Sequence, residues 1–166
     1  MGPNNLSAIC VALALAIPAF ARAQEPIPTA VFPFELADTS GEGAKPGQDE
    51  RLALATHTLV QALDASGKYR DVDLAPFAAE IKATEPRYRC ADCWAAVAHD
   101  AGARLAVIPS VHKVSTLVST MSIWIADLKT MRYIAHVQGQ IRGDTDEAYV
   151  RGVRFLVENE LLGRSH

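Results

Sequence analysis

The spacing between apolar residues changes along the chain, and the order of these changes constrains the fold more than any other feature. Residues 30–36 (AVFPFEL) are almost continuously apolar, which predicts a short buried strand. From Asp49 the apolar residues recur at three- and four-residue spacing, which predicts a helix that ends at Gly67. A strand followed by an amphipathic helix indicates a sheet that is covered by helices.

The later segments continue this alternation and then change to a run of strands. The predicted elements are a strand over 68–73, a short helix and loop over 74–89, a helix from near Cys90 to Asp100, strands over 104–109, 114–126 and 133–141, and a last helix. Asp144 is predicted to be the N-cap of that helix, with Glu147 completing a capping-box pair. The order β-α-β-α-β-β-β-α predicts an α/β (α+β) fold: a single domain over residues 30–163, with a mixed sheet of about five strands and three main helices.

Two segments bear on which strands lie at the edges of the sheet. Pro33 cannot donate to a strand ladder, so the first strand is expected at an edge or a bulge. The Ser/Thr-rich segment from Ser115 to Ser122 has two interpretations. It is either an exposed edge that pairs with a partner, or a strand whose far face packs under a helix. The second is favoured because Trp124 lies on that far face.

The N-terminus has the pattern of a secretory signal peptide over residues 1–23. An apolar run from Leu6 to Phe20 is followed by Ala21-Arg22-Ala23, which predicts cleavage between Ala23 and Gln24. The run is shorter than the roughly 20 residues of a membrane-spanning helix, although an uncleaved anchor is the alternative. After cleavage we expect a flexible lead-in over 24–29, no stable membrane span and a periplasmic location.

The charge balance and the absence of motifs exclude several classes of function. The chain has 16 Lys and Arg against 19 Asp and Glu, without a basic cluster, which argues against nucleic-acid binding. It has no phosphate-binding glycine loop and no nucleophile elbow. We therefore expect no catalytic residues, no cofactor and no metal site.

Cys90 and Cys93 are the only cysteines of the predicted mature chain, and their C-x-x-C spacing has three interpretations. In an oxidising compartment a disulfide is expected, and two residues three apart on a helical turn are close enough to form one. The alternatives are a thiol-disulfide oxidoreductase, with Cys90 as nucleophile and Cys93 as resolving thiol, or a metal-binding protein. No strand is predicted directly before the motif and no second cysteine pair follows it, so the structural disulfide is favoured.

Several motifs together resemble a family of predicted secreted bacterial proteins of unknown function. They are AVFPFELADTS near the start, SGKYRDVD after the first helix, AHDAGARLAVIPSVHKVS, and IADLKT before RGDTDEAYVRG. That family is more distantly similar to the α/β domain of the N-terminal part of the Tol-system protein TolB, the curli secretion lipoprotein and the outer-membrane activators of penicillin-binding proteins. The resemblance implies an envelope accessory or interaction domain and carries no catalytic residues.

Together these observations predict a secreted periplasmic accessory or binding protein without catalytic activity. The expected partner is another cell-envelope protein, and a small ligand in a cleft at the sheet edge is the next possibility.

Overall fold

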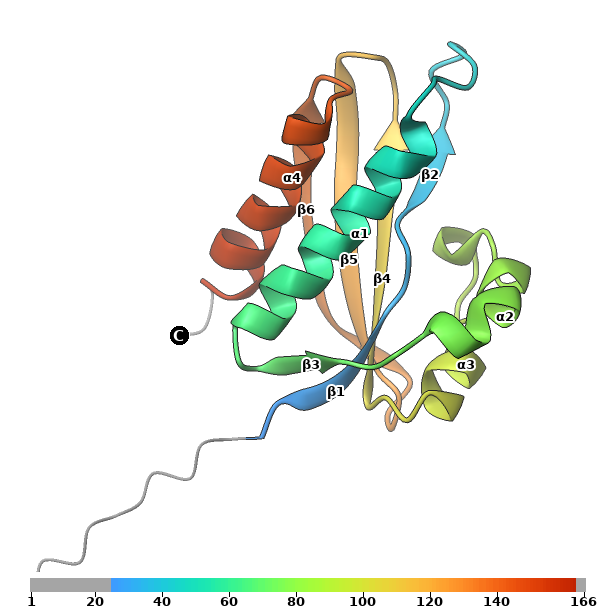
Figure 1. Cartoon of the computed structure of the whole chain (residues 1–166), viewed down its shortest axis with the longest axis vertical. Coiled ribbons are helices and arrows are strands. Elements are labelled where there is room, and N and C mark those ends of the chain that lie inside the picture. Colours follow the sequence, from blue (N-terminus) through green and yellow to red (C-terminus); the bar gives the residue numbers. More distant parts are fainter. Residues whose placement is uncertain (1–24, 164–166) are drawn as a thin grey trace, which may run out of the picture.

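The computed structural model describes residues 25–163, in which a six-stranded mixed sheet carries helices on both faces (Figure 1). The predicted signal peptide and its cleavage site at Ala23 and Gln24 lie outside the described residues. The strands are β1 (Ile27–Val31), β2 (Glu35–Asp38), β3 (Tyr69–Asp71), β4 (Leu105–Lys113), β5 (Val118–Asp127) and β6 (Arg132–Arg142). The helices are α1 (Gln48–Ala65), α2 (Ala78–Ala83), α3 (Ala95–Asp100) and α4 (Asp146–Phe155), with short turns η1 (Ala75–Phe77), η2 (Arg87–Arg89) and η3 (Leu156–Leu161). The predicted α/β class is confirmed.

The sheet has a parallel half and an antiparallel half that meet at β4. Its order is β3-β1-β4-β5-β6, and β2 pairs with β4 beyond the end of β1. β1 pairs in parallel with both β3 and β4, and β2 pairs in parallel with β4. In contrast, β4, β5 and β6 form an antiparallel meander. Among residues 25–163, no helix combines the length and apolar character needed to cross a membrane.

The predicted strand over 30–36 is in fact two strands, β1 and β2, separated at Pro33. The carbonyl of Val107 accepts a hydrogen bond from the Phe32 N–H (3.0 Å), so odd-numbered residues of β4 direct their backbone groups towards β1 and β2. Pro109 lies in the middle of β4, between the residues that pair with β1 and those that pair with β2. The side of Pro109 that has no N–H therefore faces the gap between β1 and β2. A central proline is tolerated because its missing donor faces this break.

Two hydrophobic clusters lie on the two faces of the sheet. On one face α1 and α4 lie side by side and cover a core that includes Leu59, Val107, Ile123 and Val153 (Figure 1). On the other face the segment from η1 to α3 covers a smaller core, which includes Phe32, Ile81, Trp94 and Ile108. In the sheet, this second core includes residues of β1 and β4 and, from β5, Ala126.

The remaining differences from the sequence expectations have local causes. β1 begins at Ile27, three residues before the expected strand, because its first residues pair with β3. α3 begins at Ala95, so the two cysteines lie in the turn before this helix. The N-cap of α4 is Thr145, whose Oγ1 accepts from the Ala148 N–H (3.3 Å), because the carboxylate of Asp144 instead binds cations from α1 and β4.

Candidate binding site on the open face of the sheet

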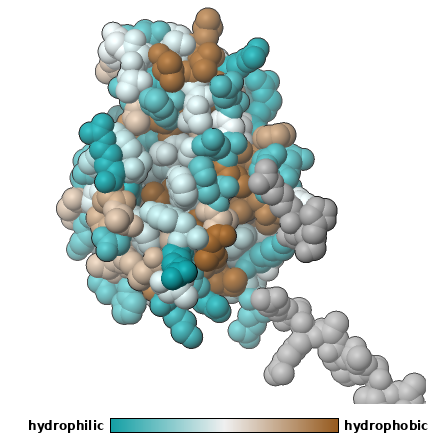
Figure 2. Space-filling view, turned by 180° about the vertical axis from the view of Figure 1, so that it is seen from behind, coloured by the Kyte–Doolittle hydropathy of each residue, from teal (hydrophilic) through white to brown (hydrophobic). Residues whose placement is uncertain are grey.

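Part of the sheet surface is not covered by any helix of residues 25–163. Met121, Ile123 and Ile125 of β5 are buried against the α1 and α4 side, so the alternate residues of β5 point to the opposite face. We call this uncovered area of β5 and β6 the open face. It carries the side chains of Val118, Thr120, Ser122, Trp124, Tyr133, His136, Gln138, Gln140 and Arg142. Figure 2 shows the molecule from this side, with teal and pale side chains predominating and brown in separate patches.

Three aromatic rings form a cluster on the open face. Trp124 lies directly opposite His136, and the two rings are stacked with centroids 3.5 Å apart and 7° between their planes. Tyr133 approaches Trp124 edge-on, with centroids 5.2 Å apart. Burial lowers the pKa of His136, which favours the neutral form of its ring. Trp124 remains 36% exposed and Tyr133 47% exposed, so the cluster is accessible to a partner.

A β-bulge places Tyr133 in this cluster. Ile125 pairs with Ala135 while Ala126 pairs with Tyr133, so Ile134 is an extra residue in β6. Without it, Tyr133 would lie on the α1 and α4 side of the sheet, because successive strand residues alternate between faces. The bulge therefore brings Tyr133 and His136 to the same face, on either side of Trp124.

The disulfide-closed turn lies beside this cluster. Cys90 and Cys93 are joined by a disulfide, with their Cα atoms 5.8 Å apart. The Tyr133 hydroxyl donates a hydrogen bond to the Ala91 carbonyl inside this turn (3.4 Å). The Tyr133 ring also lies 6.2 Å from the ring of buried Trp94, the residue after Cys93. These contacts hold Tyr133 against the disulfide-closed turn.

The segment before Cys90 is η2, in agreement with the expected loop or short helix, and a strand does not precede the motif. A thioredoxin-like site needs such a strand, so this geometry does not favour the oxidoreductase hypothesis. Within the described part of the chain, no three His, Cys, Asp or Glu side chains are grouped closely enough to hold a metal ion.

A buried ion pair fixes η2 against the sheet. The Arg87 guanidinium lies 2.8 Å from a Glu35 carboxylate oxygen of β2, and both side chains are almost fully buried. Arg87 also donates to the carbonyl of Ile81 (2.8 Å) and lies over the Phe32 ring. Burial raises the pKa of Glu35, although the charge of Arg87 acts in the opposite direction. These contacts hold Tyr88 and the disulfide turn beside the open face.

A hollow of about 170 Å³ lies between the aromatic cluster and η2. Its lining includes Tyr88, Cys90, Ser110, Trp124 and Tyr133. This volume is smaller than the roughly 300–1,000 Å³ of typical small-molecule sites. The hollow therefore fits a single side chain of a partner better than a whole ligand.

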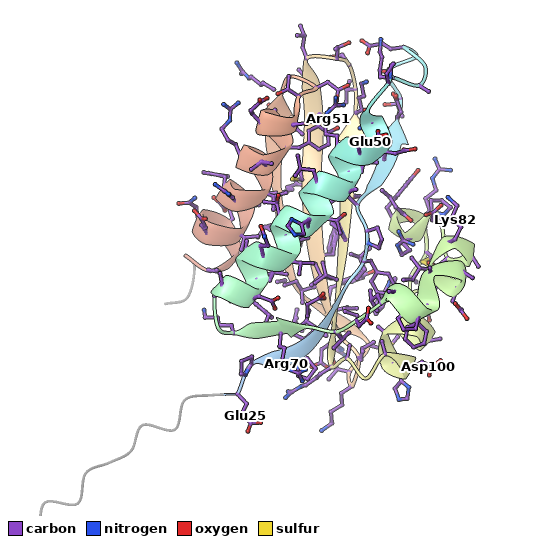
Figure 3. All side chains as sticks on the ribbon, in the orientation of Figure 1. Glu25, Glu50, Arg51, Arg70, Lys82 and Asp100 are labelled. Carbon is purple, nitrogen blue, oxygen red and sulfur yellow. A yellow bond between two sulfur atoms is a disulfide. The ribbon has the colours of Figure 1, made fainter. Side chains whose placement is uncertain are left out.

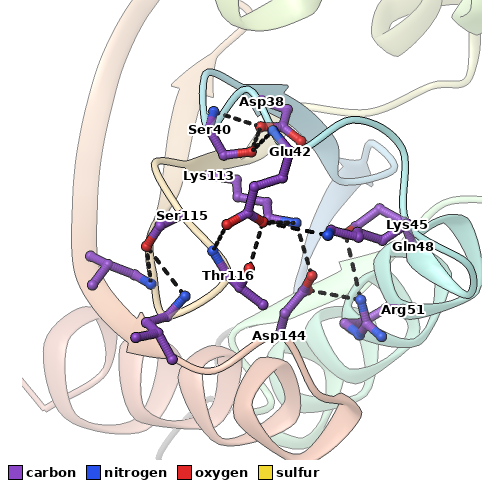
Figure 4. A network of polar contacts seen from close by, with 12 residues as sticks. Asp38, Ser40, Glu42, Lys45, Gln48, Arg51, Lys113, Ser115, Thr116 and Asp144 are labelled. Atoms are coloured by element: carbon purple, nitrogen blue, oxygen red, sulfur yellow. Dashed lines mark hydrogen bonds and ion pairs between the residues drawn. The ribbon is translucent and has the colours of Figure 1, made fainter.

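A separate polar network lies at the end of the sheet where β4 turns into β5 (Figure 4). Buried Lys113 lies 3.0 Å from Asp144 and 3.7 Å from Glu42, and Asp144 also binds Arg51 at 2.8 Å. Burial of the ammonium group acts to lower the pKa of Lys113, but the hydrogen bond that it donates to Asp144 and the nearby carboxylates outweigh burial and raise that pKa. Glu42 accepts from the Thr116 N–H (3.0 Å). The network fastens the loop over 39–47 to the β4–β5 hairpin, which is a structural role.

Some features of this site were predicted from the sequence, and others were not. Cys90 and Cys93 lie beside the open face as a disulfide. The segment from Ser115 to Ser122 does not form an edge, because β5 lies between β4 and β6. The favoured interpretation is also wrong: no helix of residues 25–163 covers this face of β5, and Trp124 is 36% exposed on it. Sequence reasoning placed Trp124 on the face away from the core but did not link it to Tyr133, because that contact depends on the bulge.

The fold is similar to that of several solved bacterial proteins. The LpoB C-terminal domain from Salmonella enterica is 15% identical, with 74% of this chain and 87% of that chain covered and a TM-score of 0.53. A PelC dodecamer from Paraburkholderia phytofirmans is 12% identical, with 80% and 86% covered and a TM-score of 0.50. TolB from Acinetobacter baumannii is 12% identical, with 85% and 29% covered and a TM-score of 0.46. For the LpoB domain and PelC, identities this low show a shared fold alone.

A search of curated proteins found no match to the chain. Residues 28–161, in contrast, match the family DUF3280, described as a protein of unknown function (DUF2380). This match extends from β1 to η3, and so covers nearly the whole described domain. The predicted resemblance to an uncharacterised family with this α/β fold is thereby confirmed, and the chain belongs to the DUF3280 family.

Proposed function

We propose that the protein is a non-catalytic binding module of the periplasm that holds another cell-envelope protein on its open face. The observation that carries this proposal is the exposed cluster of Trp124, Tyr133 and His136 on a part of the sheet that no described helix covers. Trp and Tyr are the residue types that most often dominate the binding energy of protein interfaces.

The rest of the open face supports a protein partner. Next to the cluster, Ser122, Gln138 and Gln140 supply uncharged donors and acceptors, and Arg142 is the single permanent charge among the nine side chains of the open face. Interfaces have an aromatic centre, few charges in that centre and hydrogen-bonding groups around it. The small hollow beside Tyr88 is suited to one anchoring side chain of the partner.

The location in the envelope is supported by three observations. The sequence predicts a signal peptide ahead of the domain. Cys90 and Cys93 form a disulfide, which persists in oxidising compartments. The fold is that of the LpoB C-terminal domain, in line with the resemblance to envelope accessory domains.

The proposal is tested by site-specific photo-crosslinking in intact cells. A photoreactive amino acid replaces Gln138, which is exposed on the open face, or His57, which is exposed on α1 on the opposite side. We expect a discrete adduct from position 138 only, and mass spectrometry should identify its partner as an exported protein.

A second variant shows whether the aromatic cluster drives the binding. Trp124→Ala with Tyr133→Ala, in the position-138 background, should reduce the adduct at least 10-fold while thermal unfolding shows a folded protein. Equal adducts from positions 138 and 57, or an adduct that is insensitive to the double substitution, would contradict the proposal.

A further inference from the structure

A second surface lies at the opposite side of β4, where the edge of the sheet is only partly occupied. β3 pairs with β1 over Ile27–Thr29, and the chain then leaves the sheet for η1. β2 pairs with β4 alone among the described strands. The position in the sheet that would continue β3 alongside β2 is therefore vacant within the described domain.

The backbone of β2 directs hydrogen-bonding groups into this vacant position. The Thr39 N–H donates to the Lys113 carbonyl (2.9 Å), so the odd-numbered residues of this segment face β4. Successive peptide groups alternate in direction, so Leu36 and Asp38 face away from β4. The Phe34 N–H confirms this direction, because it is bound by Thr56 Oγ1 of α1 (2.9 Å) rather than by a strand.

Three adjoining hollows line this edge and form what we call the edge groove. They have volumes of about 370, 420 and 780 Å³. The first two share Pro33, Lys82 and Glu85, and the last two share Leu36 and Asp49, so the three lie next to one another along the edge. One wall is the N-terminal half of α1, which carries Glu50, and the other is the α2–η2 segment, which carries Lys82 (Figure 3).

The dimensions of the edge groove suit an extended segment. It runs beside residues 31–38, which at about 3.3 Å per residue corresponds to a length of roughly 25 Å. The apolar side chains of Leu36 and Leu52 lie in its middle section. An incoming strand would therefore find backbone partners along one side and apolar contacts beneath alternate side chains.

The charge of the edge groove indicates which side chains an extended segment bound in it would carry. The two larger hollows are lined by five carboxylates (Glu35, Asp38, Asp49, Glu50 and Glu85) against two lysines, Lys45 and Lys82. Glu35 is neutralised by Arg87, and Glu85 is paired with Lys82. The carboxylates at the wide end thus still exceed the cations, which favours a partner with Lys or Arg side chains.

We propose that the edge groove binds an extended, basic peptide segment of a partner protein, which adds to β2 as a strand in line with β3. This site is independent of the open face, and it lies on the other side of β4. The peptide N–H and C=O groups pair with Leu36 and Asp38, and its Lys or Arg side chains lie near Asp49 and Glu50.

The experiment uses the chain from Gln24 to His166, the mature form that the sequence predicts, with its disulfide intact, and a fluorescent eight-residue peptide of alternating Lys and Val. We expect binding by fluorescence anisotropy and slower amide hydrogen exchange at Leu36 and Asp38. The same peptide with alternate amides N-methylated should bind at least 10-fold more weakly, because it cannot donate to the strand edge. A Glu-Val peptide should not bind.

Matched protein variants locate the site. Asp49→Asn with Glu50→Gln should weaken binding about 5-fold, whereas Asp100→Asn with Glu158→Gln, which removes two charges elsewhere, should not. Ala53→Trp places a large side chain on the exposed wall of the groove and should weaken binding at least 10-fold, whereas Gln61→Trp further along α1 should not.

Three outcomes would overturn the proposal. They are equal binding of the N-methylated peptide, unchanged exchange at Leu36 and Asp38, or a self-association by light scattering that Ala53→Trp abolishes, since a second copy would then be the occupant. Trp124→Ala with Tyr133→Ala should leave peptide binding unchanged, so that failure of this proposal and failure of the open-face proposal are distinguishable.

Discussion

The carboxylate of Asp71 at the end of β3 is poorly accommodated in its charged form. Burial, together with the nearby charges of Asp64 and Asp73, raises its pKa from 3.8 to about 6. Its Oδ1 is buried without a hydrogen-bond partner among the described residues, while the Asp71 N–H donates to Asp64 Oδ1 (2.8 Å). At neutral pH the folded protein therefore holds an ionised group in an unfavourable site.

We expect Asp71→Asn to stabilise the protein by about 1 kcal/mol at pH 7.5. In the wild type the folded state holds this proton more tightly than the unfolded state. Stability contributed by Asp71 is therefore present at low pH and is lost as the pH rises from 3.8 through about 6. Urea unfolding at a series of pH values should show that loss in the wild type and in Asp100→Asn, but not in Asp71→Asn. Identical pH profiles for all three proteins would refute this account.

At the scale of elements, the disulfide turn joins two parts of the fold that are distant in sequence. Cys90→Ser with Cys93→Ser should lower the free energy of unfolding by about 2 kcal/mol, the chain-entropy contribution of so small a loop. The fluorescence of Trp94 and Trp124 should change in the folded variant, because Tyr133 loses a fixed carbonyl partner at Ala91. Calorimetry and fluorescence spectra provide the measurements. Insulin reduction by the wild type would instead support the oxidoreductase hypothesis.

The close packing of α4 on the sheet depends on Gly152. A Cβ at this position would lie 2.5 Å from Ile141 Cγ2 and 3.5 Å from Met121 Sδ, and both residues are buried. Because the contact is so short, Gly152→Ala should cost about 2–3 kcal/mol from overpacking, which exceeds the helix-propensity gain of about 1 kcal/mol. Gly139→Ala is the matched control on β6. Its nearest contact is the flexible end of Leu156 at 3.2 Å, so chemical denaturation should show a smaller loss. A larger loss of stability for Gly139→Ala than for Gly152→Ala would contradict this account, because Gly152 would then not limit the distance between α4 and β6.

At the scale of the whole molecule, the sequence predicted those elements whose signals are local. The apolar period over Gln48–Ala65 repeats for five turns, and Gly67 has the positive φ of 67° that a helix stop favours. The antiparallel meander follows from short turns between neighbouring strands. The aromatic cluster and the edge groove could not be predicted in this way, because each depends on pairings between distant segments. The split of the first strand is an example: Pro33 lies between β1 and β2, and Pro109 lies in β4 between the residues that pair with β1 and those that pair with β2.

The position of β1 in the sheet has a consequence for the order of folding. β1 is the first strand of the domain, yet both of its neighbours, β3 and β4, come later in the chain. The β4–β5–β6 hairpins bring together residues that are close in sequence, and such contacts form in microseconds, whereas long loops close at a greater entropic cost. We therefore expect the C-terminal half to assemble first and to serve as a template, so that β1, although it is synthesised first, is the last strand to enter the sheet. A nascent chain that ends before β4 lacks the strand with which both β1 and β2 pair, so we expect its N-terminal half to remain without a completed sheet.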